Sequence, residues 1–368
     1  MARDPVDVSA GLPPVSRRRR GRWWKILLVV LATGLVGTLV ATTLIHVPYV
    51  IISPGSATAL DDQVVSITGT PTFAHSGAVL YLTVLASSED PTLLRYLVAH
   101  LDHDVDIEPK ANVIGGCATY DENSRLNDEL MTQSQDAAKT VALRRLGYSV
   151  VTESTKAVVA DVLCTGPSRG RLMLGDVITA VDGTPVSTAE DVGPLVRTHH
   201  PGEVARITVR RGEVTQDVNV PLGTKDAAAY LGIAIQTMTT ERFPFTVKID
   251  TARVSGPSAG LAFALAIIDD LTPGALTGGR RVAVTGEIDA QGNVGQVGGV
   301  AQKTVAAREN GATLMLVPPG EAKTARTHAE GMQVVTVRTL DQALAALQRA
   351  GGAAVPVVPS AGVGASAQ

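Results

Sequence analysis

Ser258 is the residue of this sequence best placed to act as a nucleophile. It lies in the segment 256–260 (GPSAG), directly before residues 261–270, an almost wholly apolar stretch that predicts a buried helix. A serine hydroxyl must lose its proton as it attacks, and the oxyanion that then forms needs hydrogen-bond donors. Glycines let backbone N–H groups approach, and the N-terminus of a helix adds the positive end of its dipole. The segment predicts a nucleophilic serine, against the simpler alternative of a serine that caps the helix.

Lys303 is the candidate base for this serine. The preceding segment 292–302 contains Val294, Val297 and Val300 and no acidic residue. A lysine acts as a base only when it is neutral, and lowering its pKa by about three units from about 10.4 costs about 4 kcal/mol. Burial among these apolar residues would lower the pKa by desolvation. Taken alone, Lys303 is more simply a solvated helix residue; together with Ser258 it favours a Ser–Lys dyad.

Three segments around these residues resemble, in order and spacing, the proteolytic domain of Lon-type peptidases. They are residues 254–261 (VSGPSAGL), 284–288 (VTGEI) and 292–303 (GNVGQVGGVAQK), and the resemblance covers about residues 245–320. It implies that Ser258 is the nucleophile, that Lys303 is the base and that Thr285 helps to hold the lysine amine.

Two other functions fit parts of the sequence. The segment 256–260 also satisfies the G-x-S-x-G pattern of α/β-hydrolases, in which Asp289 and His328 would complete a Ser…Asp…His triad. Proline is a poor neighbour for the strained turn of that fold, and His328 lies in a polar stretch typical of a surface. A non-catalytic scaffold with a decayed peptidase fold is the second alternative, but such a domain has no reason to keep both Ser258 and Lys303.

Apolar runs, and the glycines, prolines and capping residues that end them, predict the helices and strands that position Ser258 and Lys303. The sequence predicts strands over 79–85, 281–285 and 313–317, and helices over 127–146, 261–270, 301–310 and 339–350.

Residues 26–45 are twenty residues without a charge, long enough at about 1.5 Å per residue to cross a bilayer core of roughly 30 Å. Seven basic and two acidic side chains lie in residues 1–25, so the N-terminus is expected in the cytoplasm and the rest outside the cell membrane. A cleaved signal peptide is the alternative, although the apolar run is longer than the usual one. Beyond residue 25 the chain carries a net charge of −8, which argues against binding to nucleic acid.

Residues 148–224 resemble a bacterial PDZ domain, through the segment 170–186 (GRLMLGDVITAVDGTPV) and the predicted hairpin 204–221. In that family an extended peptide adds as a strand between a sheet edge and a helix. The resemblance implies an edge strand over 156–163 and a groove helix over 189–198. No carboxylate-binding loop is readable.

Together these features are similar to the membrane-bound, PDZ-containing Lon-like proteases of bacteria. The expected fold is α+β, with one transmembrane helix and a PDZ-like domain inserted into a Lon-type proteolytic domain. The expected segments are a cytoplasmic basic tail (1–25), a transmembrane helix (26–45), the first part of the protease domain (46–147), the PDZ-like domain (148–224), the catalytic part (225–350) and a disordered tail (351–368).

The expected activity is ATP-independent cleavage of unfolded or exposed proteins and peptides by a serine endopeptidase. The sequence holds no G-x-x-x-x-G-K-[ST] motif. The resemblance implies no cofactor, no metal and a ring-shaped homo-oligomer, a hexamer. Cys117 and Cys164 are the only cysteines; either a disulfide between them or two separate buried thiols fits the sequence.

Overall fold

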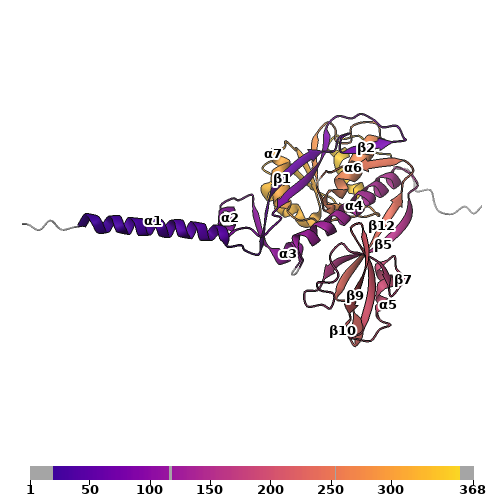
Figure 1. Ribbon diagram of the computed structural model, residues 1–368. Coiled ribbons are helices and arrows are strands. Elements are labelled where there is room, and N and C mark those ends of the chain that lie inside the picture. The colour runs from indigo at the N-terminus through magenta and orange to yellow at the C-terminus, as the bar shows by residue number, and fades with distance from the viewer. Residues whose placement is uncertain (1–19, 116–117, 253, 357–368) are drawn as a thin grey trace, which may run out of the picture.

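A computed structural model of the chain describes residues 20–115, 118–252 and 254–356. A long N-terminal helix, α1 (Arg20–Leu44), projects from a body with two parts (Figure 1). The larger part is built on one six-stranded sheet and carries the predicted dyad, and the smaller part is built on a second six-stranded sheet. The chain therefore has the mixed helix and strand architecture that the sequence predicts.

The larger sheet has the strand order β18-β17-β14-β3-β1-β4. Its strands are β1 (Tyr49–Ala59), β3 (Ala78–Ala86), β4 (Asp106–Pro109), β14 (Arg281–Val284), β17 (Leu314–Val317) and β18 (Gln333–Thr336). The strands β3, β14, β17 and β18 run parallel, whereas β1 pairs antiparallel with both β3 and β4. The predicted strands at 79–85, 281–285 and 313–317 are confirmed and lie side by side.

Helices cover both faces of this sheet because its buried strands are apolar on both sides. Val79 and Tyr81 of β3 pack with α4 (Tyr120–Arg145), α6 (Gly260–Leu271) and α9 (Leu340–Arg349). Leu80 and Leu82, which alternate with them, pack on the other face with α7 (Val300–Glu309) and α8 (Ala322–His328). The helix α6 is buried along its whole length up to Asp270, as its apolar sequence predicts.

The smaller sheet has the order β12-β5-β6-β8-β9, with β7 paired to β6. Its elements are β5 (Val151–Val162), β6 (Val177–Val181), β7 (Thr184–Pro185), α5 (Ala189–Val196), β8 (Val204–Arg211), β9 (Val214–Pro221) and β12 (Ile233–Arg242). The predicted edge strand at 156–163 is wrong. It lies in β5, which is an inner strand because β12 pairs with it from Val151 to Val162. The sheet therefore extends beyond residue 224, the boundary expected from the sequence.

The helix α4 connects the two parts of the body (Figure 1). It packs on α6 in the larger part, and toward the smaller part Glu129 forms an ion pair with Lys156 of β5. Its Gln133 also accepts a hydrogen bond from Gln236 of β12 at 3.5 Å. The helix begins earlier than residue 127, the predicted start, because Thr119 and Glu122 form a capping box there.

The remaining elements are short. They are β2 (Val65–Thr68), which pairs with β13 (Thr246–Ile249), α2 (Leu93–Ala99), α3 (Lys110–Ile114), the hairpin of β10 (Gly223–Lys225) and β11 (Ala228–Tyr230), the hairpin of β15 (Glu287–Ile288) and β16 (Val294–Gly295), and the 3₁₀ helices η1 (Pro257–Ala259) and η2 (Pro319–Glu321).

Within α1, Trp23–Leu44 form a candidate membrane span of 22 residues with a mean hydropathy of 2.2, none of it buried. Its length and composition fit both a membrane span and a signal sequence. Cys164 is disulfide-bonded, which excludes the alternative of a free thiol there, whereas Cys117 lies outside the described residues. Residues 1–19 of the expected basic tail and 357–368 of the expected disordered tail also lie outside them.

Candidate active site

The turn that carries Ser258 is held from two sides through its backbone. From α4, the carbonyl of Asn127 accepts a hydrogen bond from Gly256 N at 3.1 Å, and Ser134 Oγ donates to the carbonyl of Pro257 at 2.9 Å. From the segment between β14 and β15, Gly286 N donates to the carbonyl of Ser258 at 3.0 Å. Ser258 is the middle residue of η1, and Ala259 connects it to the first residue of α6, Gly260. The turn is thus fixed with its serine at the N-terminal end of a buried helix.

Lys303 meets Ser258 from the helix α7. Its Nζ donates a hydrogen bond to Ser258 Oγ at 2.8 Å, although the two residues are 45 positions apart. The turn into α7 needs Gly299, whose φ of 66° is left-handed and whose added Cβ would lie 2.7 Å from Val84 Cγ1. The sequence therefore predicts correctly which two side chains the fold brings together.

The side chain of Lys303 is buried, with 3% of the residue exposed. Desolvation lowers the pKa of its amine from 10.5 to about 8, while the carboxyl groups of Glu287 and Glu321 act in the opposite direction. Burial likewise raises the pKa of Glu287, and the charge of Lys303 lowers it in part. The sequence indicates the burial of Lys303 but not its two carboxyl neighbours, because Glu287 and Glu321 lie 16 residues before it and 18 residues after it in the chain.

Thr285 is fully buried next to Ser258. Its Oγ1 donates to the carbonyl of Ser258 at 3.4 Å, and its own N–H donates to the carbonyl of Leu316 at 3.1 Å. These contacts hold the backbone of Ser258. Thr285 Oγ1 therefore bonds to the carbonyl of Ser258, whereas the sequence predicts a contact with the amine of Lys303.

The alternative triad of Ser258, Asp289 and His328 does not assemble in the described structure. Asp289 accepts hydrogen bonds from the N–H groups of Gln291 and Asn293 and from the Asn293 side chain, which closes the turn between β15 and β16. His328 is at the exposed end of α8, where its Nδ1 bonds to the carbonyl of Thr324 at 3.0 Å. Both residues thus have local structural contacts.

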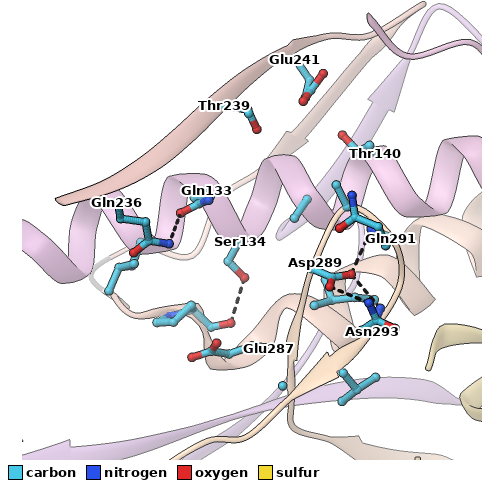
Figure 2. Close-up of a pocket in the computed structure, with 17 residues that line it drawn as sticks. Gln133, Ser134, Thr140, Gln236, Thr239, Glu241, Glu287, Asp289, Gln291 and Asn293 are labelled. Atoms are coloured by element: carbon cyan, nitrogen blue, oxygen red, sulfur yellow. Dashed lines mark hydrogen bonds between the residues drawn. The ribbon is translucent and has the colours of Figure 1, made fainter. Parts of the chain in front are cut away.

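A cavity of about 730 Å³ lies beside the dyad (Figure 2). Pro257 and Glu287 border it next to Ser258 and Lys303, and its walls are α4, β12 and the hairpin of β15 and β16. The lining residues are Leu130, Gln133, Ser134, Ala137, Thr140, Gln236, Thr239, Glu241, Pro257, Glu287, Ile288, Asp289, Ala290, Gln291, Asn293, Val294 and Gly295. This cavity has room for several residues of an extended peptide.

A second cavity, of about 480 Å³, is bordered by α5, by the hairpin of β10 and β11 and by the start of β12. Val192 and Val196 of α5 face Ile233 and Ile235 of β12 across it. The predicted groove helix is therefore confirmed as one wall of a groove, but the opposite wall is β12 and not the strand at 156–163.

Among the described residues no group of three or more His, Cys, Asp or Glu side chains is placed to hold a metal ion.

Comparisons with known proteins match the two parts of the body separately. The family described as PDZ domain matches residues 144–222, and the family described as Lon protease (S16) C-terminal proteolytic domain matches residues 229–349.

Among curated relatives, the Lon protease of Methylocella silvestris is 32% identical over 190 residues, which cover 48% of this chain and 22% of the relative. Lon protease 2 of Bacillus subtilis is 26% identical over 201 residues, which cover 52% of this chain and 33% of the relative. The chain thus spans a third or less of the length of these relatives. Among solved structures, the PDZ domain of an SdrC-like protein from Listeria monocytogenes is 22% identical and covers 23% of this chain and 90% of that domain, with a TM-score of 0.21.

Proposed function

We propose that this chain is a membrane-anchored serine endopeptidase that cleaves unfolded or exposed protein segments without ATP. The matches to a PDZ domain and to a Lon-type proteolytic domain support this proposal. The observation that carries the proposal is the 2.8 Å contact between Ser258 Oγ and the buried amine of Lys303. A buried lysine with a pKa of about 8 is neutral in a useful fraction of molecules near neutral pH, which a base requires.

The geometry supports an acyl-enzyme mechanism. Ser258 Oγ attacks the scissile carbonyl carbon while its proton passes to the neutral Lys303 Nζ. The protonated amine then gives this proton to the leaving nitrogen as the C–N bond breaks. A water molecule attacks the acyl carbon next and loses a proton to Lys303. As the ester C–O bond breaks, protonated Lys303 returns this proton to Ser258 Oγ, which restores the hydroxyl and the neutral amine. The N-terminal end of α6 stabilises the oxyanion in both steps through its dipole.

The PDZ domain supplies the docking site in this proposal. In the sheet formed by the described residues, no strand pairs with the outer edge of β12, so an extended peptide adds there as a further strand and places side chains against Val192 and Val196. The helix α1 supplies the membrane anchor, with the catalytic part outside the cytoplasmic membrane. Because the sequence lacks a P-loop motif, the substrates are segments that are already unfolded. A hexameric ring is part of the same proposal and rests on the likeness to Lon-type domains alone.

The test is the cleavage of an unfolded protein by the full chain in lipid bilayers without ATP. The Ser258→Ala and Lys303→Met variants should lose activity by at least about 1,000-fold while keeping the parent's melting temperature within a few degrees. Lys323→Met, at an exposed position of α8, is the matched control and should retain full activity. Full activity of Ser258→Ala would end the proposal, and a parent that is folded but inactive in bilayers would favour the scaffold alternative.

A further inference from the structure

The cavity beside the dyad is negatively charged on its walls. Among the described residues, its lining includes the carboxyl groups of Glu241, Glu287 and Asp289 and no lysine, arginine or histidine. Two of the three carboxyl groups have a function already. Asp289 closes its own turn, and Glu287 faces the charge of Lys303. Glu241 is therefore the one whose presence in the cavity needs a further explanation.

Glu241 is a buried carboxyl group with one unused oxygen. The residue is 9% exposed, and its Oε1 accepts a hydrogen bond from Thr152 Oγ1 at 3.0 Å. Its Oε2 is buried and has no hydrogen-bond partner in the described structure, and none of the ion pairs among the described residues includes Glu241. A buried carboxylate oxygen without a donor is costly, so such a group is kept when a ligand satisfies it.

Thr140 presents a second unused oxygen to the same cavity from the opposite wall. The residue is fully buried in α4, and its Oγ1 also has no partner in the described structure. In the view of Figure 2, the side chain of Thr140 projects from the upper side of α4 toward Glu241, and Glu287 lies below the helix. Two buried oxygens without a partner in the described structure, one from each wall, thus border the part of the cavity away from Glu287.

The neighbouring cation does not neutralise this pair. Lys139 precedes Thr140 in α4, but its amine pairs with Asp136 at 3.1 Å and lies 5.4 Å from the ring centroid of Phe243. The carboxyl group of Glu241 therefore keeps its attraction for a positive charge from outside the chain.

We propose that Glu241 and Thr140 form a subsite for a lysine or arginine side chain of the substrate, a proposal that rests on the proposed peptidase function. The charged end donates hydrogen bonds to Glu241 Oε2 and Thr140 Oγ1, which satisfies both oxygens with a charge-assisted contact. The aliphatic stem lies along Leu130 and Ala137, the apolar part of the same wall. The dyad then cuts at a fixed distance from a basic residue of the substrate.

The test begins with the cleavage sites of the full chain in bilayers on an unfolded protein, mapped by mass spectrometry. We expect lysine and arginine to be enriched at one fixed position relative to the cut bond. Peptides that carry lysine or its neutral isostere norleucine at that position then give a ratio of kcat/KM, which should exceed about tenfold in favour of lysine. The Glu241→Gln variant should reduce this ratio to less than about threefold, because Gln still accepts the bond from Thr152 but carries no charge.

Glu153→Gln is the matched control, since Glu153 is exposed on the neighbouring strand β5 and should leave both the activity and the ratio unchanged. Charge reversal in Glu241→Lys should turn the preference toward glutamate at the same position. Thr140→Val provides a second measurement if Glu241→Gln fails to fold, and it should lower the ratio in the same direction.

Three outcomes overturn the subsite. They are cleavage with no basic preference, a preference that Glu241→Gln leaves intact, and equal effects of Glu241→Gln and Glu153→Gln; the first would mean that water alone satisfies the two oxygens. If the parent cleaves nothing, the proposed function fails, and the subsite is then judged by binding. The lysine peptide should bind the Ser258→Ala chain at least about tenfold more tightly than the norleucine peptide, and equal binding ends the proposal.

Discussion

The amine of Lys303 is subject to two opposing influences, and their balance fixes its usefulness as a base. Burial removes water and lowers its pKa, while Glu287 and Glu321 favour the charged form and raise it. Burial has the larger effect, so the pKa settles at about 8. Without the two carboxyl groups the pKa of the amine would be lower, so it would be neutral over a wider pH range but would bind the serine proton more weakly. In the mechanism that we propose, the carboxyl groups thus keep the pKa of Lys303 near neutral pH, where a general base is most efficient.

The first prediction concerns the pH dependence of kcat/KM on a short peptide between pH 6 and 10. Because only neutral Lys303 accepts the serine proton, activity should rise with pH and reach half of its plateau near pH 8. The Glu287→Gln variant removes an influence that raises the pKa of Lys303, so its midpoint should lie at lower pH. Glu309→Gln, at the exposed end of α7, should leave the midpoint in place. A profile that is flat or falls across this range would show that Lys303 is not the titrating base.

At the scale of the elements, the dyad depends on how closely three segments approach one another. The helix α6 begins at Gly260, against which α4 and β15 both pack. A Cβ on Gly260 would lie 2.7 Å from Ser134 Oγ, 3.0 Å from Ile288 Cγ2 and 3.2 Å from the Ile288 backbone nitrogen. Gly260 is therefore needed for packing, because its missing side chain lets α6 contact both α4 and β15 closely.

We accordingly predict that Gly260→Ala lowers the free energy of unfolding by about 1–3 kcal/mol, since the added Cβ would press on the side chains of Ser134 and Ile288 and on the Ile288 backbone. It should also lower kcat, because the added methyl group displaces Ser134 from the carbonyl of Pro257. Gly298→Ala is the control, as a Cβ there meets nothing within 4 Å. Chemical denaturation and kcat of both variants decide the matter, and equal stability of the two would contradict the packing argument.

The same scale shows what could be predicted from the sequence and what could not. Ser258, Lys303 and the strands and helices of the larger sheet follow from local patterns, because glycine-rich turns and apolar runs are visible within a few residues. The sequence does not show that Glu241 and Thr140 line one cavity, because the two residues are about a hundred positions apart in the chain and only the fold brings them together. The edge strand was misplaced for a related reason: the pattern of β5 shows that it is a strand, but not that β12 covers it.

At the scale of the whole molecule, β12 connects the groove beside α5 with the cavity beside Ser258 and Lys303. Ile233 and Ile235 near its start line the groove against α5, while Gln236, Thr239 and Glu241 farther along line the cavity beside the dyad. The residues of β12 belong to the range 229–349 that matches the proteolytic domain, yet the strand forms its ladder hydrogen bonds with β5 of the smaller sheet. A peptide that extends along its free edge would therefore pass from one part of the body to the other without a break.

This continuity predicts that a change in the groove affects long substrates and spares short ones. The Ile235→Glu variant places a charge in the apolar groove, so kcat/KM for an unfolded protein should fall by about 5- to 10-fold, mainly through KM. A short peptide that fills only the cavity beside the dyad should be cleaved within about twofold of the parent rate, because Ile235 does not line that cavity. Val204→Glu, on an exposed position of β8, provides the same substitution outside the groove and should change neither value. Equal losses on both substrates would mean that the PDZ domain acts by supporting or gating the dyad, and no loss on either would mean that substrates reach Ser258 by a path that does not use β12.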